Sequence, residues 1–264
     1  MPSRRLFITA AAASAVLGAA GVVVGTTVAD SDQRDLRAAQ HPGAPTASVS
    51  PQPLVLAGNR VLFQGDSITD AYRQRGARGP NVGMGRGYAG LVASGVLGAH
   101  RGQRISFYNR GVSGDTIERL QQRWQHDTLD LTPDVISLLI GVNDFWGRKS
   151  RAGGRRTAAM YQHDLAELVD RTLTRLPAAR LIICEPFALP TGYVTAEWMR
   201  EYVEWRAAAA EVARDRRLPF VAFQQMFDRA LADHPAKHWA EDGVHPTRAG
   251  AALMARQWRS VAGC

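Results

Sequence analysis

The sequence predicts one α/β domain in which a parallel sheet lies between layers of helices. Short apolar runs alternate along the chain with longer segments that repeat apolar residues at helical spacing. Strands that alternate with helices form right-handed βαβ crossovers, and such crossovers build a parallel sheet. The chain has 264 residues and is 45% hydrophobic, which suits one large core, or at most two small ones.

Five short apolar runs are the predicted strands. The third is continuously apolar, which is typical of a strand buried on both faces of a parallel sheet. In sheets of this kind the ligand lies beyond the carboxyl ends of the strands. The runs are the one that begins at Val61 and breaks into a polar turn with Ser67, and those over 105–109, 135–140, 180–184 and 220–223.

Segments with apolar residues at helical spacing lie between and after these strands. Asp115 or Thr116 is expected to cap the second helix, in which Arg123 and Trp124 are expected to serve packing and the surface. The helices are expected over 88–99, from 116 to about 131, from the end of the basic loop 148–156 to about 176, over 195–217, and from 247 onward.

The segment 76–87 is rich in Gly and Arg and is expected to be a loop. Its Gly-Met-Gly-Arg-Gly string over 83–87 has some likeness to a phosphate cradle. It does not directly follow a strand and lacks the Lys-Ser/Thr of a P-loop, so nucleotide binding is not expected.

The first 53 residues are expected to lie outside the folded domain. Arg4 and Arg5 precede a long stretch rich in Ala, Gly and Val, so the segment 1–29 resembles a twin-arginine export signal. Residues 30–53 lack apolar periodicity, as expected of a disordered linker. The domain is expected to span 54–264 and to be secreted, with the membrane contacted only through the signal. The alternative is an uncleaved anchor that holds the domain outside the cytoplasm.

The charge, cysteine and histidine patterns argue against several function classes. The formal net charge is +8 and the pI about 10.2, but the basic residues are scattered, so we expect a solvated surface and no nucleic-acid partner. Cys184 and Cys264 give no disulfide framework and no metal pattern. His234 and His238 have the spacing of a metal pair but no third ligand at a sensible spacing, so no metal and no cofactor are expected. A homo-oligomer is left open.

Polar motifs follow the first three predicted strands, and they contain Ser67, Gly114 and Asn143. A serine hydroxyl needs a histidine base and an orienter for that base to become a nucleophile. Asp242 and His245 lie three residues apart in a loop with Gly and Pro after the last strand. The aspartate can accept the Nδ1 proton of the histidine and leave Nε2 to face the serine. The sequence therefore predicts a nucleophilic serine site.

Other polar side chains beside these motifs have different interpretations. Ser113 also lies between a strand and a helix, but the chain has no Gly-x-Ser-x-Gly elbow, which favours Ser67 as the nucleophile. Asp66 and Asp144 are expected to be structural, through hydrogen bonds in the turn and the loop.

Four motifs, taken together in order, identify a family. The chain resembles the SGNH, or GDSL-type, serine hydrolases over about residues 54–262. Within that family, the longer strings around the motifs and Trp239 shortly before Asp242 resemble bacterial acetylxylan esterases. The motifs are Gly65-Asp66-Ser67, the Gly of Val112-Ser113-Gly114-Asp115, Gly141-Val142-Asn143-Asp144 and Asp242-Gly243-Val244-His245-Pro246.

The resemblance implies a flavodoxin-like three-layer α/β/α sandwich with a five-stranded parallel sheet. It implies a catalytic triad of Ser67, His245 and Asp242. It also implies an oxyanion hole made by the backbone N–H groups of Ser67 and Gly114 and by the side-chain amide of Asn143.

The implied activity is that of a secreted carboxylic ester hydrolase that removes acetyl groups from a carbohydrate such as xylan, through an acyl-enzyme. Trp146 and Trp239 are candidate pocket residues, where stacking on a sugar and walling the pocket are equally open. The alternative is a lipase, lysophospholipase or thioesterase of the same fold. A non-catalytic carbohydrate-binding protein is less favoured, because every catalytic position is present.

Overall fold

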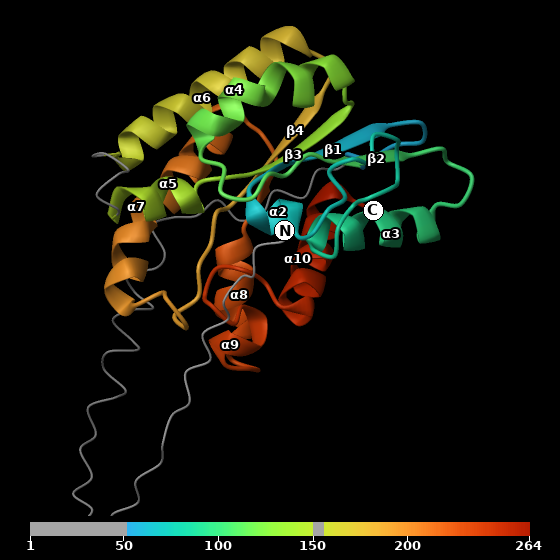
Figure 1. Cartoon of the computed structure of the whole chain (residues 1–264). Helices are drawn as coiled ribbons and strands as arrows, with labels where there is room; N and C mark the ends of the chain where they lie inside the picture. Colours follow the sequence, from blue (N-terminus) through green and yellow to red (C-terminus); the bar gives the residue numbers. More distant parts are fainter. Residues whose placement is uncertain (1–51, 150–155) are drawn as a thin grey trace, which may run out of the picture.

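The computed structural model describes residues 52–149 and 156–264 (Figure 1). The predicted export signal over 1–29 lies outside the described residues, as does the predicted linker over 30–53 except for its last two positions. No helix within the described ranges is both long enough and apolar enough to cross a membrane.

All five strands run parallel in a single sheet whose order is β2-β1-β3-β4-β5. The chain passes from β1 out to β2 and then returns past β1 to β3, so the direction of winding reverses at β1. Ligands of such sheets bind at this switch point. The strands are β1 (Arg60–Gly65), β2 (Ser106–Asn109), β3 (Val135–Leu139), β4 (Arg180–Cys184) and β5 (Phe220–Val221).

Helices cover both faces of the sheet (Figure 1). One layer contains α3 (Tyr88–Ala99), α8 (Phe223–Ala230) and α10 (Arg248–Ala262), and the other contains α4 (Ile117–Asp127), α6 (Ala158–Arg175) and α7 (Ala196–Asp215). The predicted flavodoxin-like α/β/α sandwich is therefore confirmed. The shorter helices are α2 (Ser67–Asp70), η1 (Leu129–Leu131), α5 (Val142–Lys149) and α9 (Ala236–Trp239).

The long helices α4, α6, α7 and α10 each begin directly after a threonine. In each case the threonine side chain accepts a hydrogen bond from the backbone N–H three residues later, which satisfies a donor that the first turn leaves free. Thr116 is thus the cap of α4, as one of the two residues expected there. The capping residues are Thr116, Thr157, Thr195 and Thr247.

Two buried tryptophans, one on each side of the sheet, have hydrogen-bonded indole N–H groups. On one face, Trp258 packs against Phe63 with ring centroids 5.2 Å apart and donates to Ser137 Oγ in β3 at 2.9 Å. On the other face, Trp124 donates to Thr172 Oγ1 at 3.0 Å. Because a buried donor without a partner costs free energy, these bonds help to fix α10 on β3 and α4 against α6.

The helix expected to about 131 ends at Asp127 and is followed by η1, and the short helices α2 and α9 were not expected. Two further differences have a clear cause. The last strand ends at Val221, because Phe223 already begins α8, whose Gln224 N–H is bonded at 3.0 Å to the buried carboxylate of Glu185. The chain after β3 forms α5, where the sequence suggested a turn and a loop, because Phe145 is buried among aromatic side chains of α7. Both differences depend on partners that are distant in the sequence.

Candidate active site

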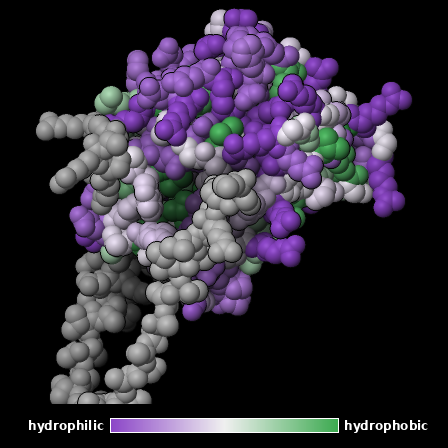
Figure 2. All heavy atoms as spheres, in the orientation of Figure 1, coloured by the Kyte–Doolittle hydropathy of each residue, from purple (hydrophilic) through white to green (hydrophobic). Residues whose placement is uncertain are grey.

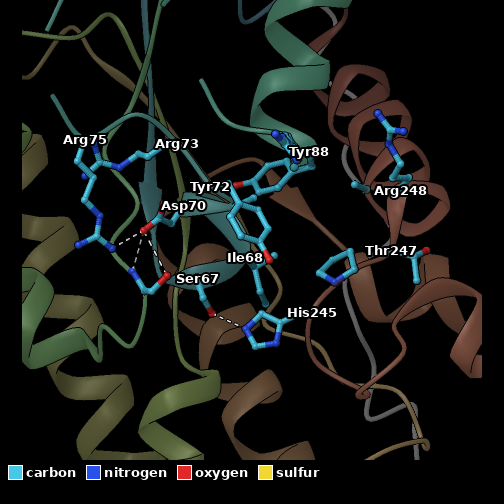
Figure 3. A pocket seen from close by; sticks show the side chains of 16 residues that line it. Ser67, Ile68, Asp70, Tyr72, Arg73, Arg75, Tyr88, His245, Thr247 and Arg248 are labelled. Atoms are coloured by element: carbon cyan, nitrogen blue, oxygen red, sulfur yellow. Dashed lines mark hydrogen bonds and ion pairs between the residues drawn. The ribbon is translucent and has the colours of Figure 1, made fainter. Parts of the chain in front are cut away.

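A cleft of about 840 Å³ opens at the carboxyl ends of the strands, beside the switch point at β1 (Figure 3). Its walls come from α2, from the chain between α2 and α3, from Ser113 after β2, and from the segment that runs from His245 into the start of α10. Ser67 and His245 both line it, so the two strongest candidates from the sequence share one cavity. A volume of this size is typical of a small-molecule site.

Ser67 is the first residue of α2 and is joined to His245 and Asp242 by a chain of hydrogen bonds. Ser67 Oγ lies 2.8 Å from His245 Nε2, and His245 Nδ1 lies 2.6 Å from Asp242 Oδ2 (Figure 3 shows the first contact). An ionised carboxylate only accepts hydrogen bonds, so Nδ1 carries the proton and Nε2 of a neutral ring accepts the serine proton. This arrangement can turn the Ser67 hydroxyl into a nucleophile.

Asp242 is held in its acceptor role by its own loop. Its Oδ1 accepts the backbone N–H groups of Val244 at 2.9 Å and His245 at 2.7 Å. Partial burial raises the pKa of Asp242, but the hydrogen bonds from the His245 ring and from these two N–H groups outweigh it and leave the pKa below its usual value. The carboxylate is therefore ionised at neutral pH, as an orienter of histidine requires.

The loop that carries Asp242 and His245 is closed at its base and supported from outside. Ala240 and Pro246 form an isolated antiparallel bridge that closes the loop. The turn after β4 packs against it so closely that a Cβ on Gly192 would lie 2.5 Å from Asp242 Cα. The position of the carboxylate thus depends on a residue 50 positions earlier, which no sequence motif singled out.

The loop after β2, which carries Gly114, is tied to the start of α5 after β3, which carries Asn143. Asn143 Nδ2 donates to the backbone carbonyl of Asp115 at 2.9 Å. A side-chain amide has two N–H donors, so this bond orients the group and leaves its second N–H for another acceptor. Asp144 accepts the Ile117 N–H and a bond from Arg156, which strengthens the same connection. Asp144 therefore has the structural role expected for it.

Arg123 on α4 braces the ends of β1 and β2 from behind the site, although the sequence suggested only packing and surface for it. Its guanidinium is largely buried and is surrounded by acceptors, which makes it a fixed part of the scaffold. The acceptors are Asp115 Oδ2 at 2.6 Å, Arg110 O at 2.8 Å, Gln64 Oε1 at 2.9 Å, Asp127 Oδ2 at 3.0 Å and Gly65 O at 3.2 Å.

Two buried carboxyl groups lie near Ser67. Asp66 accepts the Ile68 N–H at 3.0 Å and so caps α2, which is the structural role expected for it. Full burial raises the pKa of Asp66 to about 7, although the Ile68 N–H and the nearby His245 act to lower it. Burial likewise raises the pKa of Asp144 to about 6, against the opposing effect of Arg156. Both groups therefore gain charge only near neutral pH.

Ser113, the rival nucleophile, has a different partner. Its Oγ and its backbone N–H both donate to Asp70 Oδ2 at 3.2 Å, and Asp70 also accepts a bond from Arg75. A hydroxyl bonded to a carboxylate that already pairs with an arginine lacks the imidazole base that Ser67 has. The geometry therefore favours Ser67.

Neither of the two candidate tryptophans is among the residues that line the cleft. Trp146 on α5 is 41% exposed and makes an edge contact with Tyr193, at a centroid distance of 6.3 Å. Trp239 is half buried and donates its indole N–H to the carbonyls of Ala230 and His234. Trp239 thus anchors the connection between α8 and α9.

The histidine pair and the metal-ligand candidates also lie outside the cleft. The rings of His234 and His238 stack on one another with centroids 4.2 Å apart. Within the described ranges, one group of three side chains has ligand atoms within 4.8 Å of one another, and it lies on the surface of α6. It consists of His163, Asp164 and Glu167, of which Asp164 is paired with Arg156.

This fold, with a hydrogen-bonded serine, histidine and aspartate beyond its strand ends, places the chain in the class of carboxylic ester hydrolases. The chain belongs to the GDSL-like lipase/acylhydrolase family, whose model matches residues 63–253. An acetylxylan esterase of Geobacillus stearothermophilus is 29% identical over 202 residues, which are 76% of this chain and 92% of that protein.

Solved structures agree with this family membership. A GDSL-like lipase candidate from Parabacteroides merdae superposes with a TM-score of 0.77 at 37% identity, over 80% of this chain and 99% of that one. Axe2, an acetylxylan esterase from Geobacillus stearothermophilus, superposes with a TM-score of 0.72 at 28% identity, over 79% of this chain and 96% of that one. Catalytic mutants of Axe2 replace a serine, a histidine, or an aspartate three positions before that histidine.

Proposed function

We propose that the chain is a serine esterase that removes acetyl and other short acyl groups from carbohydrates, with Ser67 as the nucleophile. The observation that carries the proposal is the hydrogen-bonded chain from Ser67 through His245 to Asp242, open to a cleft of about 840 Å³. The spacing of Asp242 and His245 is also that of the aspartate and histidine changed in the Axe2 mutants.

In the proposed reaction, His245 Nε2 takes the proton from Ser67 Oγ as that oxygen attacks the ester carbonyl. Asp242 stabilises the imidazolium that forms. The charge that develops on the carbonyl oxygen is stabilised by the N–H groups of Ser67 and Gly114 and by the Asn143 amide. His245 then protonates the departing alcohol, which leaves an acetyl group on Ser67. Water activated by the same histidine releases acetate and restores the serine.

The character of the cleft favours a polar alcohol part over a lipid. Charged and hydroxyl-bearing side chains line the cleft beside apolar ones, among them Arg73, Arg75, Asp70 and Thr247. Figure 2 shows a largely hydrophilic face in which the hydrophobic residues form small, separate patches. A lipase needs apolar contacts for a long acyl chain, and sugar hydroxyls are instead matched by polar groups. The export signal predicted from the sequence supports a substrate outside the cytoplasm.

The experiment is acetate release from acetylated xylan and acetylated monosaccharides, measured beside nitrophenyl esters from acetyl to octanoyl. We expect the acetyl substrates to be preferred and Ser67→Ala to lose essentially all activity, since it lacks the attacking oxygen. Ser113→Ala is the matched control, because it removes a neighbouring hydroxyl bonded to Asp70 and should keep most of the activity. A Ser67→Ala protein as active as its parent would overturn the mechanism. A clear preference for octanoyl esters would overturn the substrate class.

A further inference from the structure

The cleft beside Ser67 is lined by more positive charge than its own acids can neutralise. Four arginines line it, and the only carboxylate among the lining residues is Asp70. They come from three places in the chain: the segment after α2, the residue before the Gly87 cap of α3, and the first position of α10. Figure 3 shows Arg73 and Arg75 on one side of the cleft and Arg248 on the other. The fourth of these arginines is Arg86.

Only one of these arginines is paired with a carboxylate among the described residues. Arg75 Nη2 lies 2.6 Å from Asp70 Oδ2. Arg73 donates through Nε to the backbone carbonyl of Gly111, a neutral acceptor. Within the described ranges, neither Arg86 nor Arg248 has an ion pair. With one acid set against four guanidinium groups, the lining carries a net formal charge of +3 before His245 is counted.

Arg73 lies among other cations. Partial burial lowers the pKa of Arg73, Asp70 raises it, and Arg110, Arg75 and Arg123 lower it further, although only Arg75 of these three lines the cleft. Arg73 is partly buried, whereas Arg75, Arg86 and Arg248 are exposed. Cations gathered around one cleft attract an anion more strongly than isolated surface arginines do. Guanidinium groups bind carboxylate and phosphate oxygens in a forked geometry.

The arginines line the part of the cleft that would hold the alcohol half of an ester. An acetyl group is small compared with about 840 Å³, so most of this space is free for the rest of the substrate. Gly114 and Asn143, the proposed oxyanion donors, are not among the lining residues. Tyr72 is 87% exposed, and its ring lies in the cleft with the Arg86 guanidinium 6.0 Å from its centroid, where a sugar ring could stack.

We propose that this esterase selects substrates whose alcohol part is a sugar bearing an anionic group, a carboxylate or a phosphate, which Arg86 and Arg248 bind. The inference rests on the proposed function, since it assigns the substrate class of the same site. A neutral acetylated sugar remains a substrate, but it lacks the charge that the arginines are placed to bind.

The test compares three acetylated hexoses that differ only at carbon 6: glucose with a free hydroxyl, glucuronic acid, and glucose 6-phosphate. The measured quantity is kcat/KM for acetate release, at low and at high salt. We expect the wild type to prefer at least one anionic sugar over the neutral one by about tenfold, which corresponds to about 1.4 kcal/mol. The preference should shrink at high salt, because the charges are partly exposed. The carboxylate and phosphate arms show which oxyanion is favoured.

The double variant Arg86→Gln/Arg248→Gln should remove most of that preference. The matched control is Arg101→Gln/Arg256→Gln, which changes the net charge equally. Arg256 is exposed on α10 and does not line the cleft, and Arg101 is exposed at the end of α3 that leads to the start of β2. The control variant should retain the preference of the wild type.

Each failure has a distinct signature. If the wild type releases acetate equally well from all three sugars, the charge selectivity is wrong and the proposed esterase function stands. If none of the sugars releases acetate, the proposed function fails. Calorimetric titration with glucuronate, glucose 6-phosphate and glucose then decides the charge proposal. The charge proposal is supported if an anionic sugar binds more tightly than glucose and if this difference is lost in Arg86→Gln/Arg248→Gln but kept in the control variant. It is overturned if all three sugars bind equally or if none binds detectably.

Discussion

Gly192 lies outside every recognisable motif, yet the structure predicts that a single methyl group there disables the site. Its φ is +61°, and a Cβ would lie 2.5 Å from Asp242 Cα and 2.6 Å from both the carbonyl carbon and oxygen of the same residue. These are backbone atoms, so no side-chain rotation can relieve the contact. Ordinary contact begins at 3.4 Å, so in Gly192→Ala the turn at residue 192 and the Asp242 backbone have to move apart by about 0.9 Å, and we expect the Asp242 loop to take much of this displacement.

A displacement of this size acts on catalysis through the carboxylate that orients His245. Misplacement of a catalytic group by about 1 Å can lower the rate by about 10²-fold. Complete loss of the aspartate function sets the limit, a decrease in kcat of about 10⁴-fold. We therefore expect Gly192→Ala to lower kcat for a nitrophenyl acetate by about 10²-fold, measured beside urea denaturation to establish that the variant is folded.

Gly102→Ala is the control that separates the clash from the backbone conformation. Gly102 has φ of +88°, and a Cβ there would meet nothing within 4 Å. It should lose about 1–2 kcal/mol of stability, because an L-residue is strained at positive φ, and keep the kcat of the parent. The displacement is expected to lower kcat by about 10²-fold. If Gly192→Ala is folded and its kcat stays within about threefold of the parent, the reasoning is wrong, and the turn at Gly192 does not determine the position of Asp242.

Two further predictions follow from the hydrogen-bonding and burial of the site. Asn143→Ala should lower kcat by about 10²–10³-fold with a smaller change in KM, because one oxyanion donor is lost; a variant in which only KM rises would instead indicate a role in ground-state binding. Asp66→Asn tests the buried acid: its pKa is raised from 3.8 to about 7 in the folded state, so the native protein holds this proton more tightly than the unfolded chain and loses stability as pH rises from about 4 to 7. The Asp66→Asn side chain cannot ionise, and it keeps an oxygen that accepts the Ile68 N–H. The free energy of unfolding of the variant, measured by urea denaturation, should therefore rise relative to that of the parent between about pH 4 and pH 7, by up to about 4 kcal/mol. A difference in stability that shrinks as pH rises would contradict this reasoning.

The parts of the molecule that the sequence predicted well are those with local signals. The strand at 180–184 has the predicted bounds, and the helix over 88–99 does too, because apolar periodicity is readable within a short window. The fold class followed from the alternation of such segments. The four motifs single out Ser67, Asp242 and His245, and the structure joins these three side chains in one chain of hydrogen bonds. Their catalytic roles stay a prediction.

The features that the sequence did not reveal depend on contacts between distant segments. The start of α8 is satisfied by Glu185, which lies 39 residues before Gln224. The sequence around Arg123 indicates only an ordinary residue on the surface of a helix. In the structure, its guanidinium donates to backbone carbonyls at the ends of β1 and β2. The arginines are scattered in the sequence, which predicts a solvated basic surface. The fold brings four arginines from three separate segments into one cleft, and no local pattern in the sequence indicates this.

The hydrogen bond between Ser67 and His245 joins positions 178 residues apart, one after the first strand of the sheet and the other after the last. Asp242 and His245 lie in a single short loop, which the turn at Gly192 supports from outside. A chain in which this loop has not yet reached the end of β1 has no Ser67 beside His245. Ester cleavage would thus report that these two distant segments have come together, and a newly made chain would be inert towards esters until they do.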